Sequence, residues 1–170
     1  AKTDLNMPNL TALERGICNL DAHLDNMEKF GVPVVVAINS FPTDTEEEVA
    51  FIREHCAKRG VRVALSEVFA KGGKGGKELA ETVLSILDNR PIRFTYDLEQ
   101  PLEDKIRAVA QKIYRADDVQ FTAAAKKSLA QYTEMGYGRL PVCIAKTQYS
   151  FSDDAKLLAA PEHFTMNVRE

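Results

Sequence analysis

The chain has 170 residues, of which 45% are hydrophobic and 28% are charged, and its formal net charge is -3. This composition predicts a soluble domain that can bury a core without a disulfide or a structural metal. The acidic balance argues against nucleic acid as the main partner, because phosphate binding depends on Lys and Arg. The longest apolar run is far too short to cross a membrane.

The first predicted element is an amphipathic helix that ends near Gly31. Its apolar residues recur at steps of three and four, which places them on one face. They are Leu10, Leu13, Ile17, Leu20, Leu24 and Met27. Such a face is typical of a helix packed on a sheet, and it is too short for a convincing coiled coil.

A continuous apolar run from Val32 to Ile38 predicts a strand buried on both faces, as in a parallel sheet covered by helices. The strand is followed by Thr43, Asp44 and Thr45, and each of these has a Glu three positions later. Any of them could form a capping box at the start of the next helix. We expect Gly60 to end that helix in the left-handed conformation.

The next segment, "VRVALSEVF" at residues 61–69, predicts a second strand. The glycine-rich loop "KGGKGG" then leads into a helix from Lys77 to about Asp88. Pro101 opens a further helix, because its missing N–H is harmless in the first turn. The inner face of that helix should carry Leu102, Ile106, Val109 and Ile113.

A helix at 123–135 is expected to stop at Gly136, and "LPVCIAKT" at 140–147 predicts another strand. The closing "FTMNVRE" predicts one more. Helices alternating with apolar strands indicate an α/β fold, layered, with a mainly parallel or mixed sheet and helices on both faces. We expect one α/β module over residues 1–170, and the range 89–100 is the weakest point for a subdivision.

The cysteines Cys18, Cys56 and Cys143 lie far apart in apolar or helical settings. We expect them to be reduced and buried, which suits a cytoplasmic protein. The histidines have no metal-binding spacing, and the sequence indicates no metal site.

Aromatic residues follow two neighbouring strands of the predicted sheet. Phe41 and Pro42 come directly after the first strand, and Phe69 ends the second. In open α/β sheets, ligands bind at the carboxyl ends of the strands. Two rings at that edge could sandwich a flat heterocycle. The alternative is that both rings close the end of the core.

The loop containing Lys71, Gly72, Gly73 and Lys74 offers backbone N–H groups and positive charge ahead of a helix. It could bind an anion, or it could be a surface turn. The GxxxxGK[ST] spacing of a Walker A loop is absent from the sequence, and so are GxSxG and GxGxxG. The sequence therefore indicates no catalytic residue.

Three segments together carry a resemblance to a known family: "PVVVAINSFPTDTEEE", "SEVFAKGGKGG" and "LPVCIAKTQYSFSDDAKL". The chain closely resembles the formate-tetrahydrofolate ligases, also called 10-formyltetrahydrofolate synthetases, over nearly its whole length. The resemblance implies an ATP-dependent joining of formate to tetrahydrofolate through formyl phosphate, giving 10-formyltetrahydrofolate. It implies ATP with Mg²⁺ as co-substrate and a homo-oligomer as the assembly.

The resemblance also implies roles for residues in this chain. Phe41, Pro42 and Phe69 correspond to positions that hold the pterin ring, and Leu65 corresponds to an apolar pocket position. Many members carry Trp where this chain has Phe69, which implies a smaller stacking area. Lys74 stands where an acid is expected, which leaves its effect on binding of the glutamate tail open.

The family's P-loop has no counterpart in the sequence. We therefore expect a carboxyl-side fragment that supplies the folate wall of a cleft, with the rest of the ligase chain as its partner. Without a P-loop Lys and Mg²⁺, the fragment should not turn over by itself. The alternative is a non-catalytic binding or assembly module of the same fold. An independent NTPase domain is a third, weaker option because no Walker A loop is present.

Overall fold

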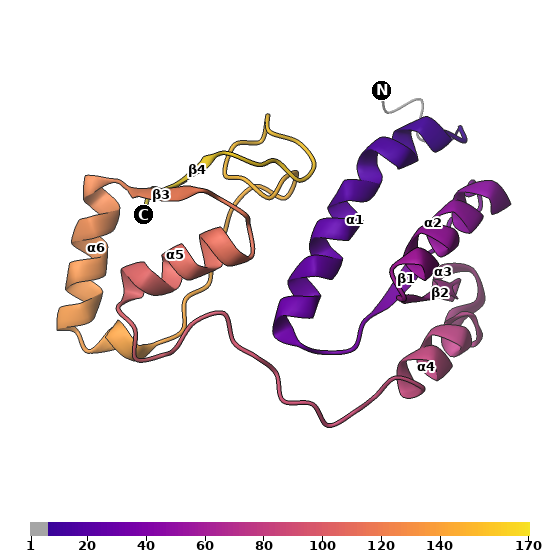
Figure 1. Ribbon diagram of the computed structural model, residues 1–170, viewed down its shortest axis with the longest axis horizontal. Coiled ribbons are helices and arrows are strands. Elements are labelled where there is room, and N and C mark those ends of the chain that lie inside the picture. The colour runs from indigo at the N-terminus through magenta and orange to yellow at the C-terminus, as the bar shows by residue number, and fades with distance from the viewer. Residues whose placement is uncertain (1–6) are drawn as a thin grey trace. The chain divides into compact units, whose positions relative to one another are not determined.

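The computed structural model describes residues 7–170, which form two compact units (Figure 1). The first unit contains the chain up to Leu20 and Gly31–Pro91, and the second contains Asp21–Phe30 and Ile92–Glu170. Each unit combines helices with a two-stranded parallel sheet, so the predicted α/β class is confirmed.

The elements follow one another with short connections, except for two irregular stretches, one between α4 and α5 and one between η3 and β4. In chain order they are α1 (Leu10–Phe30), β1 (Val35–Asn39), α2 (Glu46–Lys58), β2 (Arg62–Ser66), α3 (Val68–Lys71), the 3₁₀ helix η2 (Gly72–Gly76), α4 (Lys77–Leu84), α5 (Leu102–Lys112), β3 (Asp118–Phe121), α6 (Ala123–Glu134), the 3₁₀ helix η3 (Tyr137–Arg139) and β4 (Thr165–Val168).

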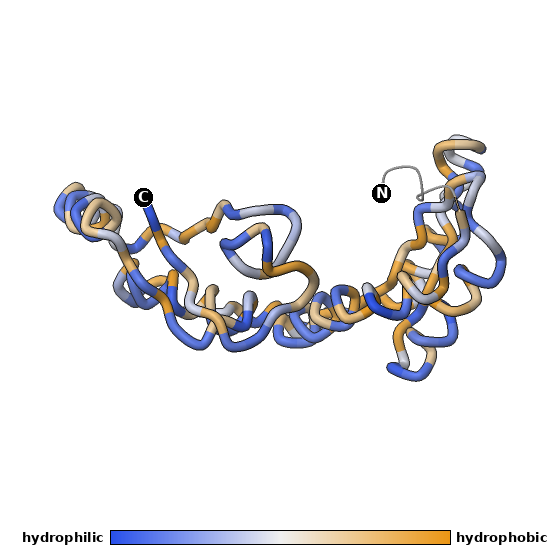
Figure 2. Tube along the Cα trace, turned by 90° about the horizontal axis from the view of Figure 1, so that it is seen from above, coloured by the Kyte–Doolittle hydropathy of each residue, from blue (hydrophilic) through white to orange (hydrophobic). Residues whose placement is uncertain are grey.

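Hydrophobic and hydrophilic residues are interspersed along the helices (Figure 2), as in amphipathic helices. Among residues 7–170, no helix combines the length and the apolar character needed to span a bilayer.

In the first unit, β1 and β2 pair in parallel, with α2 as the crossover between them. Parallel strands need such a crossover because a tight hairpin cannot join them. The core between the sheet and α2 contains small side chains: Ala64 of β2 and Cys56 of α2 are both fully buried.

A capping box starts α2 at Thr45, the third of the candidate positions in the sequence. The Thr45 side chain accepts from the Glu48 N–H at 3.3 Å, and the Glu48 carboxylate accepts from the Thr45 N–H at 3.2 Å. Gly60 follows the helix with a φ of 69°. Both helix boundaries are therefore set by local chemistry that the sequence predicted.

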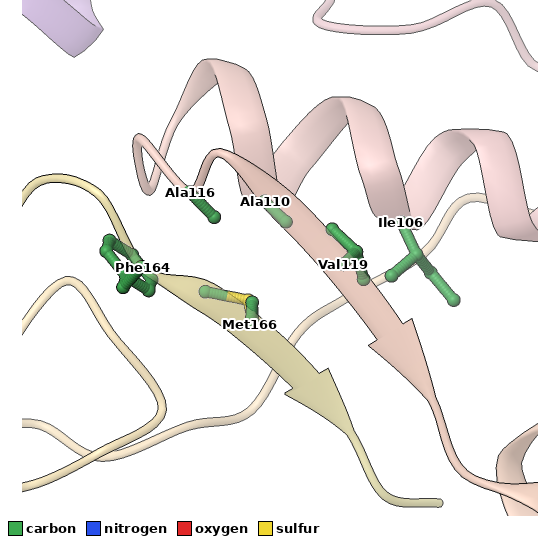
Figure 3. Packing of buried hydrophobic residues seen from close by; sticks show 6 residues of the cluster. All are labelled: Ile106, Ala110, Ala116, Val119, Phe164 and Met166. Carbon is green, nitrogen blue, oxygen red and sulfur yellow. The ribbon is translucent and has the colours of Figure 1, made fainter.

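The core of the second unit lies between α5 and the sheet of β3 and β4 (Figure 3). Val119 of β3 pairs in register with Met166 of β4, and both side chains are buried. The buried members of this core are Ile106, Ala110, Ala116, Val119, Phe164 and Met166. The predicted terminal strand is confirmed as β4, whereas the sequence did not predict β3.

A buried lysine ties α5 to the segment after α6. Lys105 is fully buried, and its Nζ donates to the carbonyls of Gly138 at 2.8 Å and Leu140 at 3.0 Å. Burial of an ammonium group is tolerated only where hydrogen bonds replace its hydration. Lys105 therefore fixes the backbone at residues 138–140, where the irregular segment after η3 begins.

The prediction of a strand at 140–147 is wrong, since this segment has no ladder partner in the described chain. Its backbone pairs with a side chain instead: the Val142 N–H donates to the Tyr96 hydroxyl at 2.9 Å. Cys143, in the same segment, is exposed rather than buried, and Cys18 is half-buried.

The second strand is shorter than predicted. It ends at Ser66, and the residues that follow turn into α3, so Phe69 lies on a helix and not on a strand. The helix after the glycine-rich loop ends at Leu84 instead of Asp88.

Candidate ligand site at the ends of two parallel strands

The carboxyl ends of β1 and β2 lie side by side. Asn39 pairs in register with Ser66, and the Ser40 N–H extends the ladder by donating to the Ser66 carbonyl at 2.9 Å. The two loops that carry Phe41 and Phe69 therefore leave the sheet at the same edge. This is the position at which α/β sheets bind ligands.

Phe41 is presented by a tight turn. The Asp44 N–H donates to the Phe41 carbonyl at 3.0 Å, and the Asp44 carboxylate accepts from the Phe41 N–H at 2.8 Å. Pro42 occupies the second position of this turn, where its fixed φ is favourable. Both backbone polar groups of Phe41 are satisfied by one residue, and Phe41 remains 55% exposed.

Phe69 is presented by the four-residue helix α3. The N–H groups of Ala70 and Lys71 donate to the Glu67 carbonyl, and the Lys71 ammonium lies 2.6 Å from the Glu67 carboxylate. Phe69 is 84% exposed. Neither Phe69 nor Phe41 closes the end of the core within residues 7–170, so that alternative is not supported.

Leu65 lies in β2 opposite Ile38 and is half-buried. Its N–H donates to the Glu78 carboxylate at 3.2 Å. Leu65 thus belongs to the same strand end that leads into α3, while Pro42 lies exposed in the turn after β1.

The glycine-rich loop is folded as η2 and packs on the start of α3. The Gly75 carbonyl accepts from the Glu67 N–H at 3.0 Å, and a Cβ on Gly75 would lie 2.3 Å from the Glu67 carbonyl oxygen. Only glycine permits this approach. Lys74 is exposed, and Gly72 has a φ of 56° that favours glycine.

A cavity of about 710 Å³ lies in the second unit and holds none of the predicted site residues. Its wall includes Cys143 and Lys146 from the segment at 140–147. Burial lowers the pKa of Lys146, whose Nζ lies 4.9 Å from the centre of the Tyr114 ring. The apolar run "LPVCIA" forms part of this cavity wall, whereas the sequence predicted it to be a strand.

Within the described part of the chain, no group of three His, Cys, Asp or Glu side chains could hold a metal ion.

The parallel pairs β1–β2 and β3–β4, each combined with helices, define an α/β protein. A family model described as formate--tetrahydrofolate ligase matches residues 1–170, the whole chain. The chain belongs to this ligase family, as the sequence motifs predicted.

Proposed function

We propose that Phe41 and Phe69 bind the two faces of the pterin ring of tetrahydrofolate, and that Pro42 and Leu65 line the same site. The full-length protein would then join formate to tetrahydrofolate at the expense of ATP. The observation that carries this proposal is the register of β1 with β2, which brings both loops to one sheet edge.

The chemistry of the ligand fits the exposed rings. A reduced pterin is flat and partly aromatic, and offset stacking adds about 0.5–1.5 kcal/mol per aromatic contact beyond burial. Among residues 7–170, no aromatic ring stacks on Phe41 or Phe69, so both rings are open to a ligand. A bound pterin would remove both rings from water.

The loop of Lys71, Gly72, Gly73 and Lys74 would face an anionic part of the ligand, such as the glutamate tail. Lys71 already pairs with Glu67. Lys74 is exposed and adds positive charge to the loop. Attraction between Lys74 and the carboxylates of the tail is the expected consequence, and it should weaken as salt is raised.

Replacement of Phe69 tests the proposal. Phe69→Ala in the full-length protein should raise the Kd for tetrahydrofolate by about tenfold, through lost stacking and lost apolar contact. Phe94 is a matched control because it is equally exposed, at 84%, and belongs to the second unit. Phe94→Ala should leave the Kd unchanged. Equal Kd values for both variants and the wild type would contradict the pterin site.

We further propose that ATP, Mg²⁺ and formate are bound mainly by residues outside the printed sequence. The support is the lack of a GxxxxGK[ST] segment within it. The 170 residues expressed alone should then form no 10-formyltetrahydrofolate from formate, ATP and tetrahydrofolate. The assay converts the product with acid and measures its absorbance. Product formation by these 170 residues alone would contradict the proposal that ATP and formate are bound elsewhere.

The alternative function is a non-catalytic binding or assembly module of the same fold. The lack of a GxxxxGK[ST] segment in the 170 residues also fits this alternative. The length of the encoding reading frame distinguishes the two functions. A GxxxxGK[ST] segment upstream supports the ligase, whereas a natural chain without one supports the module. A cytoplasmic homo-oligomer is part of the proposal in the first case.

A further inference from the structure

The strand that carries Leu65 has one edge without a partner strand in the described chain. The first unit's sheet has two strands, and β2 pairs only with β1. The Ser66 carbonyl faces β1, because it accepts from the Ser40 N–H. Backbone groups of successive residues in a strand face opposite edges, so those of Val63 and Leu65 face away from β1.

Two side chains occupy this free edge in place of a strand. Arg53 of α2 donates through Nη1 to the Val63 carbonyl at 3.4 Å, and Glu78 of α4 accepts the Leu65 N–H at 3.2 Å. The two side chains are joined to each other, since Arg53 Nη2 donates to the same Glu78 Oε1 at 3.1 Å. One donor and one acceptor of the edge are thus satisfied by an ion pair.

Glu78 is held in its charged form at this position. The hydrogen bond from Arg53, followed by the one from the Leu65 N–H, lowers its pKa below the ordinary value of 4.5. The carboxylate is therefore ionised at neutral pH and can accept both bonds. Its connection to Arg53 also links α2 with α4 across the end of β2.

We infer that Arg53 and Glu78 form a positioning pair for tetrahydrofolate: they fix the free edge of β2 and thereby hold Leu65 in the pterin site without touching the ligand. This inference rests on the proposed function, since it assigns Leu65 to that site. It adds residues to the site that lie outside the ring-binding set.

The pair acts on geometry more than on overall stability. Its side chains are 41% and 51% exposed, and ion pairs at such positions contribute little to the free energy of unfolding. Loss of Glu78 would nevertheless leave the Leu65 N–H without its acceptor and the end of β2 without a partner on that side. The expected result is a looser strand end that binds the pterin less well.

The test compares Glu78 with another glutamate of the same helix. Glu81 pairs with Lys77 at 3.6 Å, and its side chain forms no hydrogen bond or ion pair with β2 in the part of the chain that the structure describes. Glu78→Ala and Glu81→Ala both exchange Glu for Ala within α4, so the intrinsic propensity changes alike. Glu78 also lies in the first turn of α4, where its carboxylate favours the helix, and the melting temperature of each variant accounts for that difference. For each variant of the full-length protein, the Kd for tetrahydrofolate is measured by calorimetry, and amide exchange is measured for the peptide that covers β2.

Glu78→Ala should raise the Kd by roughly fivefold and accelerate exchange in β2, whereas Glu81→Ala should change neither. Glu78→Gln retains an oxygen that can accept from the Leu65 N–H, so its Kd should lie within about twofold of wild type. This variant keeps the test decisive if Glu78→Ala does not fold. A Kd for Glu78→Ala equal to that of Glu81→Ala would overturn the inference, whatever the exchange shows.

Phe69→Ala separates the two ways of failing. If Phe69→Ala raises the Kd and Glu78→Ala does not, the pterin site stands and the positioning pair is wrong. If neither raises it, the pterin site itself is wrong, and any faster exchange in β2 reports only a structural contact.

Discussion

Gly75→Ala is the substitution for which the structure predicts the sharpest effect. A Cβ at this position would lie 2.3 Å from the Glu67 carbonyl oxygen, 2.4 Å from the Glu67 carbonyl carbon and 2.9 Å from the Val68 nitrogen. Ordinary contact begins at 3.4 Å, so the methyl group overlaps backbone atoms that cannot rotate away. Overpacking of this kind costs about 1–3 kcal/mol.

The overlap would also break a contact that places Phe69. Gly75 accepts the Glu67 N–H through its carbonyl, and Glu67 provides the carbonyl on which α3 is built. If the loop moves to relieve the overlap, the start of α3 moves with it. We therefore expect Gly75→Ala to lower the opening free energy of residues 67–76 by about 2 kcal/mol and to weaken tetrahydrofolate binding severalfold.

Amide exchange of the peptide covering residues 67–76 in the full-length protein measures the first effect, and calorimetry measures the second. Gly73→Ala is the matched control, because a Cβ there meets no atom within 4 Å. Its φ is also not in the left-handed region. Because Gly73 belongs to the proposed anion-binding loop, it serves as the control for exchange only, and binding is compared with the wild type. The reasoning would be refuted if Gly75→Ala exchanged like Gly73→Ala and bound like the wild type.

Two further predictions concern the turn and the helix that follow β1. Asp44→Ala should raise the Kd for tetrahydrofolate about threefold by releasing the Phe41 N–H, while Asp44→Asn should bind like the wild type; calorimetry that shows no difference between the two variants would contradict the role of the turn. Hydrogen bonds from the Asn9 backbone and then from Thr45 lower the pKa of Glu48 below its ordinary value of 4.5. Ionised Glu48 therefore stabilises the fold above pH 4.5, and this contribution is lost as the pH falls through the lower pKa of the folded state. The unfolding midpoint of Glu48→Gln should therefore fall less steeply than that of the wild type below about pH 4.5; parallel pH profiles in thermal melts would show that the cap does not titrate.

Features that depend on neighbouring residues in the chain could be predicted from the sequence. Most predicted helices start and end close to their predicted positions, because capping and apolar periodicity are local; the exception is α4, which ends at Leu84 instead of Asp88. The box at Thr45 with Glu48 is an example, although the sequence could not choose between Thr45 and its two neighbours. In the fold, the Glu48 carboxylate also accepts from the Asn9 N–H, a contact between distant residues that no local pattern encodes.

Features that depend on distant partners were predicted less well. The strand β3 has only four residues, "DVQF", and its pairing with β4 is what defines it. Conversely, the segment at 140–147 has a strand-like composition but bonds to Tyr96, which lies 46 residues before Val142. Composition alone cannot separate these two cases.

The candidate site shows the same division. The sequence placed Phe41 and Phe69 at strand ends, and the register of β1 with β2 brings those ends together. It gave no sign of the pair formed by Arg53 and Glu78, which are 25 residues apart and meet only through the fold. Polar residues that support a site from behind have no sequence pattern of their own.

The fluorescence of Phe69→Trp tests the central claim most directly. The sequence contains no tryptophan, and Phe69 is 84% exposed, so the larger indole should be tolerated and should add an emitter at the proposed site. Tetrahydrofolate stacked on the new indole should quench its emission, with saturation at the Kd measured by calorimetry. Emission that stays unchanged at saturating tetrahydrofolate, relative to the wild-type background, would show that residue 69 does not contact the pterin.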